Sequence, residues 1–218
     1  YGGSMLAQSH VLEAVYDGPY DSNTFGYQAV ILEKLPSLAD GDALLETVTA
    51  AAGDLVVDAA GDPVTLEDGV MIKPAGCTSD ECVVEFAGEA VEMEQMVVTF
   101  KLIEGILWSD GEPLTAYDSV YAFELVKDPD TPASKYTTDR TASYEAMDDV
   151  TTVWTGLPGY RDSIYFLNFW APKPEHEWGS FTALELLEAE ESSRTPLGWG
   201  AYVIEEWVAG DHIRLTKN

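Results

Sequence analysis

The sequence predicts a mixed α/β (α+β) fold, and three observations support this prediction. An alternating apolar stretch at 98–103 is followed by turn residues and then by a helical pattern at 115–124. Short strand-like segments separated by turns fill 44–96, and a stretch at 202–216 alternates and turns back on itself. The chain is 46% hydrophobic and contains neither internal repeats nor low-complexity linkers. We therefore expect residues 1–218 to form one unit with a substantial core.

A helix is expected near the N-terminus. Apolar residues recur at intervals of three or four between Met5 and Tyr16, and Ser4 is a suitable N-cap for such a helix. The turn residues Gly18 and Pro19 end the pattern. The helix should therefore be short and lie against a core through its apolar side.

The segment 44–96 is expected to be a β-rich elaboration. Gly-Asp, Asp-Gly and Gly-Glu pairs punctuate it at intervals and favour tight turns. The apolar residues between these pairs form runs too short for helices. The expected strands are 46–50, 55–58, 63–66, 70–73 and 82–86.

The stretch 98–124 is the clearest succession of elements. Val98, Phe100 and Leu102 alternate with polar or exposed-type residues, which predicts a strand with one buried face. The run at 109–113 is dense in turn residues. Thr115 is then a candidate helix N-cap, and an Asp three residues later resembles a capping box.

The C-terminal part alternates between turns and short elements. Two prolines and two aspartates at 127–132 end the preceding helix. We expect a strand at 146–154 and an apolar run at 164–170 that is buried on both sides or lies against a partner surface. An acidic amphipathic helix at 184–191, with Leu184 and Leu187 inward and Leu186 as a further inward candidate, and a β-hairpin at 202–216 complete the chain.

The formal net charge of -28 and the pI near 4.1 restrict the partners of the chain. Nucleic acid is excluded because a phosphate backbone requires a Lys/Arg surface, and an anionic membrane face is disfavoured for the same reason. The acidity is typical of a secreted protein and also suits a saline environment. No apolar run reaches the length of a membrane span, and no signal peptide precedes Tyr1, so we expect a mature or trimmed chain.

Cys77 and Cys82 are the only cysteines. Their spacing, without a neighbouring His or further Cys, makes a poor zinc site. A local disulfide that closes a loop is the favoured interpretation, and it implies an oxidising compartment. Two reduced thiols are the alternative.

Two segments, in the right order, resemble a known family. The first reads TFKLIEGILWSDGEPLTAYDSVYAFE at 99–124, and the second reads PLGWGAY at 196–202 and continues to Asn218. This succession resembles the signature of the family 5 extracellular solute-binding proteins, the peptide-binding or nickel-binding receptors of ABC importers. Trp199 and Ala201 stand where the family has Thr and Pro. Glu175 replaces a customary Lys in the turn at 172–176.

The resemblance implies a periplasmic-binding-protein type II-like fold, of which this chain would be the N-terminal part of the first lobe. The second lobe would be absent, so tight binding by this part alone is not expected. The implied function is capture of a solute, most simply a peptide, by closure of two lobes and its delivery to a membrane permease. The implied receptor is a non-enzymatic, cofactor-free monomer outside the cell, held there by a lipid anchor. Nickel complexes, heme and oligosaccharides remain open as ligands.

The resemblance also suggests which residues face the ligand. They are Ser4 and Met5 at the first helix start, Trp170 after the apolar run, and Trp199 and Tyr202 in the altered glycine loop. Aromatic rings beside glycines offer a large contact area with little side-chain entropy to lose. The alternative for each aromatic residue is an ordinary place in the core.

Two other classes of function stay open on the residues alone. The Asp-rich turns of the β-rich segment suit a calcium-dependent adhesion module, although none has the spacing of an EF-hand loop. The abundant carboxylates could include the pair that a hydrolase needs. His176 is the candidate base, but the sequence shows no partner for it and no nucleophile motif, which favours a structural or exposed histidine.

Overall fold

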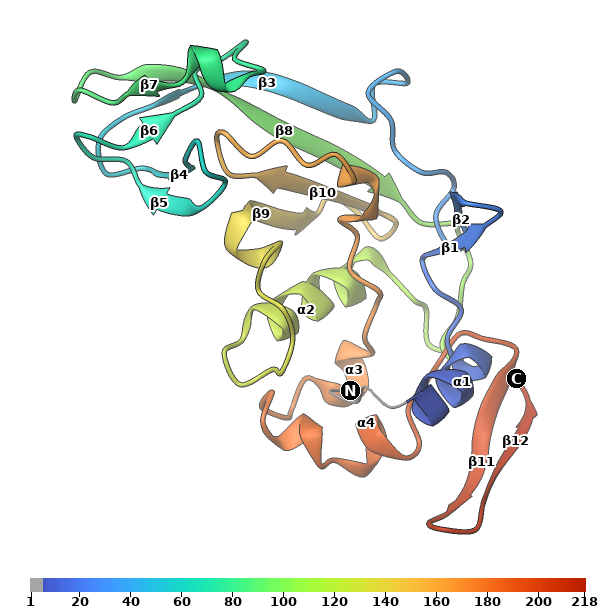
Figure 1. Cartoon of the computed structure of the whole chain (residues 1–218). Helices are drawn as coiled ribbons and strands as arrows, with labels where there is room; N and C mark the ends of the chain where they lie inside the picture. Colours follow the sequence, from blue (N-terminus) through green and yellow to red (C-terminus); the bar gives the residue numbers. More distant parts are fainter. Residues whose placement is uncertain (1–5) are drawn as a thin grey trace.

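The computed structural model describes residues 6–218 and shows a mixed α/β arrangement (Figure 1). Its longer helices are α1 (Leu6–Val15) and α2 (Ala116–Lys127), and two single turns follow as α3 (Glu175–Trp178) and α4 (Glu190–Ser193). The strands are β1 (Tyr20–Asn23), β2 (Gly26–Ala29), β3 (Ala43–Ala50), β4 (Leu55–Val57), β5 (Pro63–Thr65), β6 (Met71–Ile72), β7 (Val84–Glu85), β8 (Val91–Lys101), β9 (Thr141–Ala146), β10 (Thr151–Gly156), β11 (Tyr202–Val208) and β12 (His212–Lys217).

A four-stranded antiparallel sheet with the order β3-β8-β10-β9 forms the centre. In β8, Val98 and Phe100 are buried, and so is Leu102 just beyond the strand, whereas Lys101 is exposed. This confirms the predicted alternation. Helix α2 packs against β9 and β10, and Phe123 and Trp154 belong to the core between them. The amide of Thr115 donates to Asp118 Oδ2 at 2.8 Å, which closes the predicted cap at the start of α2.

The β-rich elaboration is confirmed as two small hairpins, β4–β5 and β6–β7, at the far end of the long strands β3 and β8 (Figure 1). It has a core of its own, which consists of Ala50, Val56, Leu66, Ile72, Phe86 and Met93. Cys77 and Cys82 form the predicted disulfide, with a Cα–Cα distance of 5.6 Å. The end of the molecule that carries this disulfide lies opposite α1 and the β11–β12 hairpin (Figure 1).

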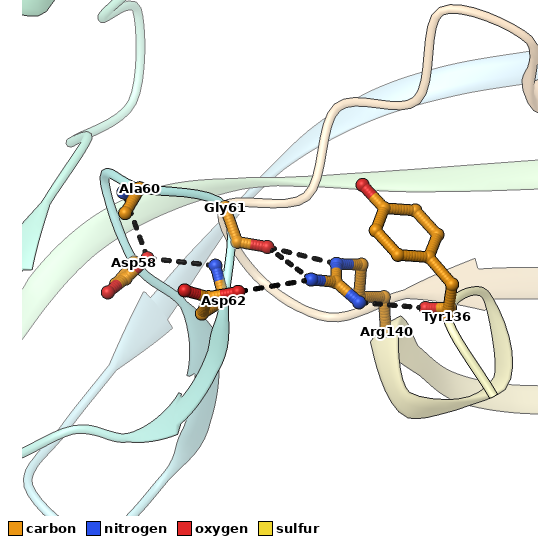
Figure 2. A network of polar contacts seen from close by, with 6 residues as sticks. All are labelled: Asp58, Ala60, Gly61, Asp62, Tyr136 and Arg140. Atoms are coloured by element: carbon orange, nitrogen blue, oxygen red, sulfur yellow. Dashed lines mark hydrogen bonds and ion pairs between the residues drawn. The ribbon is translucent and has the colours of Figure 1, made fainter.

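Arg140 joins the β4–β5 hairpin to the central sheet (Figure 2). Its guanidinium donates through Nε and Nη2 to the carbonyl oxygen of Gly61 at 2.9 and 2.7 Å, and through Nη1 to the carbonyl oxygen of Tyr136 at 2.9 Å. Asp62 Oδ1 lies 3.5 Å from Nη2, and the Tyr136 ring lies 3.8 Å from the guanidinium carbon. Because Arg140 is only 7% exposed, these contacts form a buried clamp between two parts of the chain.

The strand predicted at 146–154 is confirmed for 151–154, which lie in β10, and is wrong for 147–150 before them. Residues 147–150 form the turn between β9 and β10, and Met147 lies exposed at its tip. The Asp148 carboxylate accepts hydrogen bonds from the amides of Val150 and Thr151 at 2.9 and 2.7 Å. This side chain therefore builds a turn inside what the apolar pattern indicated as one strand.

The predicted helix at 184–191 is also wrong. A 3-10 turn at 185–187 and helix α4 replace it, because Ala189 between them has an extended backbone with φ -58° and ψ 139°. The inward residue is Leu186, which packs with the buried Trp178, whereas Leu184 is 59% exposed.

The apolar run at 164–170 is neither a strand nor buried on both sides. It contains a 3-10 turn at 165–167, and Ile164 is half-exposed while Phe169 is buried. The Asp162 carboxylate accepts a hydrogen bond from the Ile164 amide at 2.9 Å, which starts the turn. Within residues 6–218, no helix is long and apolar enough to cross a membrane.

Candidate functional site

The glycine loop at 198–200 rests directly on the end of α1. The Gly200 amide donates to the carbonyl oxygen of Val15 at 2.7 Å and thereby satisfies a carbonyl at the helix C-terminus. A Cβ atom on Gly198 would lie 2.0 Å from that oxygen, and one on Gly200 would lie 2.7 Å from it. The two glycines are therefore required by close backbone contact, and they fix the position of Trp199 between them.

Trp199 joins a group of aromatic rings that we call the aromatic junction, defined as Tyr16, Trp108, Trp178 and Trp199 with Lys173. The Trp199 ring meets the rings of Tyr16 and Trp108 edge-on, each at a centroid distance of 5.2 Å. Its indole Nε1 is buried and has no hydrogen-bond acceptor within residues 6–218. The junction therefore combines apolar contact area with an indole N–H that has no acceptor among the described residues.

The buried Asp118 positions two parts of this junction. Its carboxylate accepts from Trp108 Nε1 at 3.3 Å and from the Glu175 amide at 3.4 Å, while its carbonyl oxygen accepts from the Lys173 amide at 3.0 Å. Burial raises the pKa of the Asp118 carboxyl, although the hydrogen bonds from Thr115, Trp108 and Glu175 oppose this effect. The start of α2 thus holds both the Trp108 ring and the segment that carries Lys173.

Lys173 places its ammonium group over aromatic rings. Nζ lies 4.9 Å from the Tyr16 ring centroid and 5.9 Å from the Trp178 ring centroid. No carboxylate within residues 6–218 lies at ion-pair distance from it. Desolvation lowers the pKa of Lys173 to about 8, and no opposing charge compensates for this effect.

Acidic groups border the junction, and none of them forms an ion pair with Lys173 within the described residues. Burial, followed by the charge of Glu177, raises the pKa of the Tyr16 hydroxyl above its ordinary value. Burial, followed by the charge of Glu191, also raises the pKa of Glu177. His176 Nε2 lies 2.9 Å from Asp110 Oδ2, so the structure supplies the partner that sequence analysis did not find. This pair is half-exposed at the edge of the junction.

The predicted ligand residues do not meet at one place within the described part of the chain. Trp170 is half-buried and packs against Phe123 and Tyr144, each at a centroid distance of 4.7 Å. It also lines a cavity of about 260 Å³ together with Tyr20 and Asn168. Trp199 belongs instead to the aromatic junction, and no ring contact among residues 6–218 joins the two tryptophans.

The other three residues predicted to contact the ligand are Tyr202, Ser4 and Met5. Tyr202 begins β11 and is 46% exposed. Ser4 and Met5 lie outside the described residues, as does the predicted N-cap of α1.

Lys173, Tyr16 and Trp108 were not among the residues predicted from the sequence to face the ligand. Lys173 is one of 11 basic residues in a chain with 39 acidic ones, and prolines flank it on both sides, but neither feature marks a binding residue. Only the folded chain brings it against Tyr16 and Trp178, which come from distant segments.

The acidic turns show no cation site in the part of the chain that the structure describes. No group of three or more His, Cys, Asp or Glu side chains there could hold a metal ion. Asp58 illustrates the role of these residues: its Oδ1 accepts from the amides of Ala60 and Asp62, both at 2.9 Å (Figure 2). Its carboxylate thus stabilises its own turn.

Comparison with protein families identifies the chain. Residues 86–218, more than half of the sequence, match the model of the bacterial extracellular solute-binding proteins, family 5 middle region. The chain belongs to this family. The match includes both segments whose resemblance was read from the sequence, and it covers α2, Lys173 and Trp199.

Curated relatives of this family 5 chain are named for peptide binding. A Brucella ovis protein named for peptide binding in an ABC transporter is 29% identical over 130 residues, which cover 59% of this chain and 24% of the relative. The oligopeptide-binding protein AppA of Bacillus subtilis is 25% identical over 190 residues, which cover 76% of this chain and 34% of AppA. The chain therefore spans about a quarter to a third of the length of these relatives.

Solved structures show the same fold. The structure of Bacillus subtilis AppA in complex with a nonapeptide matches with a TM-score of 0.63 at 18% identity, over 99% of this chain and 33% of AppA. NikZ of Campylobacter jejuni in complex with Ni(L-His) matches with a TM-score of 0.57 at 15% identity, over 95% of this chain and 31% of NikZ. This likeness confirms the predicted periplasmic-binding-protein type II-like fold. The chain corresponds to about one third of each of these solved structures.

Proposed function

We propose that this family 5 chain is the N-terminal part of the first lobe of an extracellular substrate-binding component that delivers peptides to an ABC permease. The observation that carries the proposal is the agreement of nearly the whole chain with one third of AppA, whose structure holds a nonapeptide. The names of the curated relatives support the same class of ligand. We also propose that the receptor works as a monomer and is anchored to the membrane on the outer side.

We infer that this lobe supplies one wall of the binding site. Trp199 in the aromatic junction and Trp170 beside its cavity each present half-buried rings, which suit contact with peptide side chains. We assign the ligand contacts of this lobe to Ser4, Met5, Trp170, Trp199 and Tyr202. A second lobe would supply the opposite wall, and its closure would bury the ligand and create the state that the permease recognises.

Calorimetry tests the proposed function. The receptor that contains this chain and the 218-residue chain alone are titrated with a mixed pool of di- to hexapeptides, then with Ni(L-His) and with an oligosaccharide pool. We expect the receptor to bind peptides and the chain alone to bind at least 100-fold more weakly. Binding of only the nickel complex or the oligosaccharides would refute the peptide assignment. Tight peptide binding by the chain alone would refute the two-lobe arrangement.

A further inference from the structure

Lys173 carries a positive charge that no group in the described part of the chain neutralises. The chain contains 39 acidic and 11 basic residues, so a carboxylate partner would be easy to provide. The ammonium instead lies over the rings of Tyr16 and Trp178, at 4.9 and 5.9 Å from their centroids. A ring face attracts a cation, but it does not replace the hydrogen bonds that the ammonium loses on leaving water.

A second unsatisfied donor borders the same Tyr16 ring. Trp199 packs edge-on against Tyr16 at 5.2 Å, and its buried Nε1 has no acceptor within residues 6–218. A buried donor without an acceptor costs free energy and is uncommon in folded proteins. The Tyr16 ring therefore contacts two side chains, one charged and one neutral, whose donors lack acceptors among the described residues.

Two neighbouring side chains, unlike Lys173 and Trp199, have hydrogen-bond or ionic partners. Trp108, the other tryptophan in contact with Trp199, donates its Nε1 to Asp118 at 3.3 Å. His176 lies 2.9 Å from Asp110. The negative charge of Glu177 helps to raise the pKa of Tyr16. The lowered pKa of Lys173, in contrast, is caused by burial alone. None of these carboxylates forms an ion pair with the ammonium among the described residues.

We propose that Lys173, together with the indole N–H of Trp199, forms a subsite for a carboxylate of the bound solute. This inference rests on the proposed function and names the charged group of the same ligand. A carboxylate has two oxygens with four acceptor positions, so it can accept from an ammonium and an indole at once. The Lys173 side chain is half-buried rather than fully enclosed. The carboxylate comes from either the C-terminus or an acidic side chain of a peptide.

Three pentapeptides distinguish these sources. One has a free C-terminus and neutral side chains, one is amidated and contains a single Glu, and one is amidated and neutral. The receptor that contains this chain is titrated with each peptide, as wild type and as Lys173→Met. Lys127→Met is the matched control, because Lys127 also lies over a ring, that of Phe123 at 5.7 Å, but is exposed beside Glu124.

We expect Lys173→Met to weaken binding of at least one carboxylate-bearing peptide about 10- to 100-fold and to leave the amidated neutral peptide unchanged. The control should bind all three peptides like the wild type. Equal affinities of Lys173→Met and the wild type for all three peptides would overturn the inference. An equal loss for all three peptides would also overturn it, because the lysine would then act only through the structure.

A second measurement separates this inference from the proposed function. The Lys173 side-chain NMR signal, assigned by its absence in Lys173→Met, is followed during titration with N-acetylglycine and with N-acetylglycinamide. We expect the acid, but not the amide, to shift the signal and to raise the pKa of the lysine, even if no peptide binds. The inference fails if the acid leaves the signal unchanged or if both compounds shift it equally.

Discussion

Two cations in different parts of the molecule lie over tyrosine rings, and their surroundings differ. Arg140 lies 3.8 Å from the Tyr136 ring and donates to two carbonyl oxygens, with Asp62 at 3.5 Å (Figure 2). Lys173 lies 4.9 Å from the Tyr16 ring and has no hydrogen-bonding or ionic partner among the described residues. Arg140 connects two parts of the fold, whereas the ammonium of Lys173 has no acceptor among the described residues.

The difference follows from the chemistry of the two groups. A guanidinium presents several N–H donors in one plane, so Arg140 can serve Gly61 and Tyr136 at the same time and stabilise the contact between them. An ammonium is a compact and strongly hydrated charge, and ring faces compensate only part of its desolvation. A satisfied buried cation therefore indicates a structural role, and an unsatisfied one indicates a binding role.

The largest effect is expected from Arg140→Met. This change removes the hydrogen bonds from the buried Arg140 guanidinium to the carbonyl oxygens of Gly61 and Tyr136 and should lower the free energy of unfolding by about 2 kcal/mol. Urea denaturation followed by circular dichroism measures the change. Arg161→Met is the control, because Arg161 is 39% exposed and its ion pair with Glu94 should contribute less than about 1 kcal/mol. Equal effects of the two changes would contradict the structural role of Arg140.

A loss that is no larger is expected when the disulfide is removed from the Arg140 end of the molecule. Replacement of both Cys77 and Cys82 by Ser opens a short loop and should cost about 2 kcal/mol of stability. Because the loop belongs to the β-rich elaboration, amide exchange should accelerate in β6 and β7 and stay unchanged in α1. Faster exchange in α1 would show that the two ends of the molecule unfold together.

Local sequence patterns predicted much of the fold. The errors lie where the backbone turns inside a segment that the pattern indicated as one element. The strand that includes Val98 and Phe100 and the capped start of α2 depend on neighbours in sequence, so their patterns were sufficient. The strand predicted at 146–154 failed at 147–150 because the Asp148 carboxylate forms a turn there. The helix predicted at 184–191 failed at Ala189, whose extended backbone no residue pattern marked.

The assignment of Trp199 to the ligand site stays a prediction, and it came from a motif. Trp199 stands between two glycines in a segment that resembles the family signature, and it does lie in a ring cluster. Lys173 could not be predicted, because its environment is formed by Tyr16 from the end of α1 and Trp178 from α3. The absence of a counterion is a property of the folded arrangement and leaves no trace in the local sequence.

The smallest expected effect is the pH dependence that Lys173 gives to stability in the absence of ligand. Its pKa is about 8 in the folded state and near 10.5 when unfolded, so between these values the unfolded chain binds more protons. The contribution of Lys173 to stability should therefore rise with pH across this window, and below pH 8 it should be constant and unfavourable. The expected rise between pH 8 and pH 9.5 is on the order of 1 kcal/mol.

Measuring wild type and Lys173→Met side by side isolates this rise. Tyr16, Glu177 and Asp118 are present in both proteins, and the raised pKa of the Tyr16 hydroxyl keeps that group protonated in the folded state throughout the window. The difference in unfolding free energy between the two proteins should therefore change in favour of the wild type as pH rises. A flat difference would mean that the ammonium is already solvated or paired in the free protein. The contrast between Lys173 and the satisfied Arg140 would then disappear, and with it the physical reason to expect a ligand carboxylate at this position.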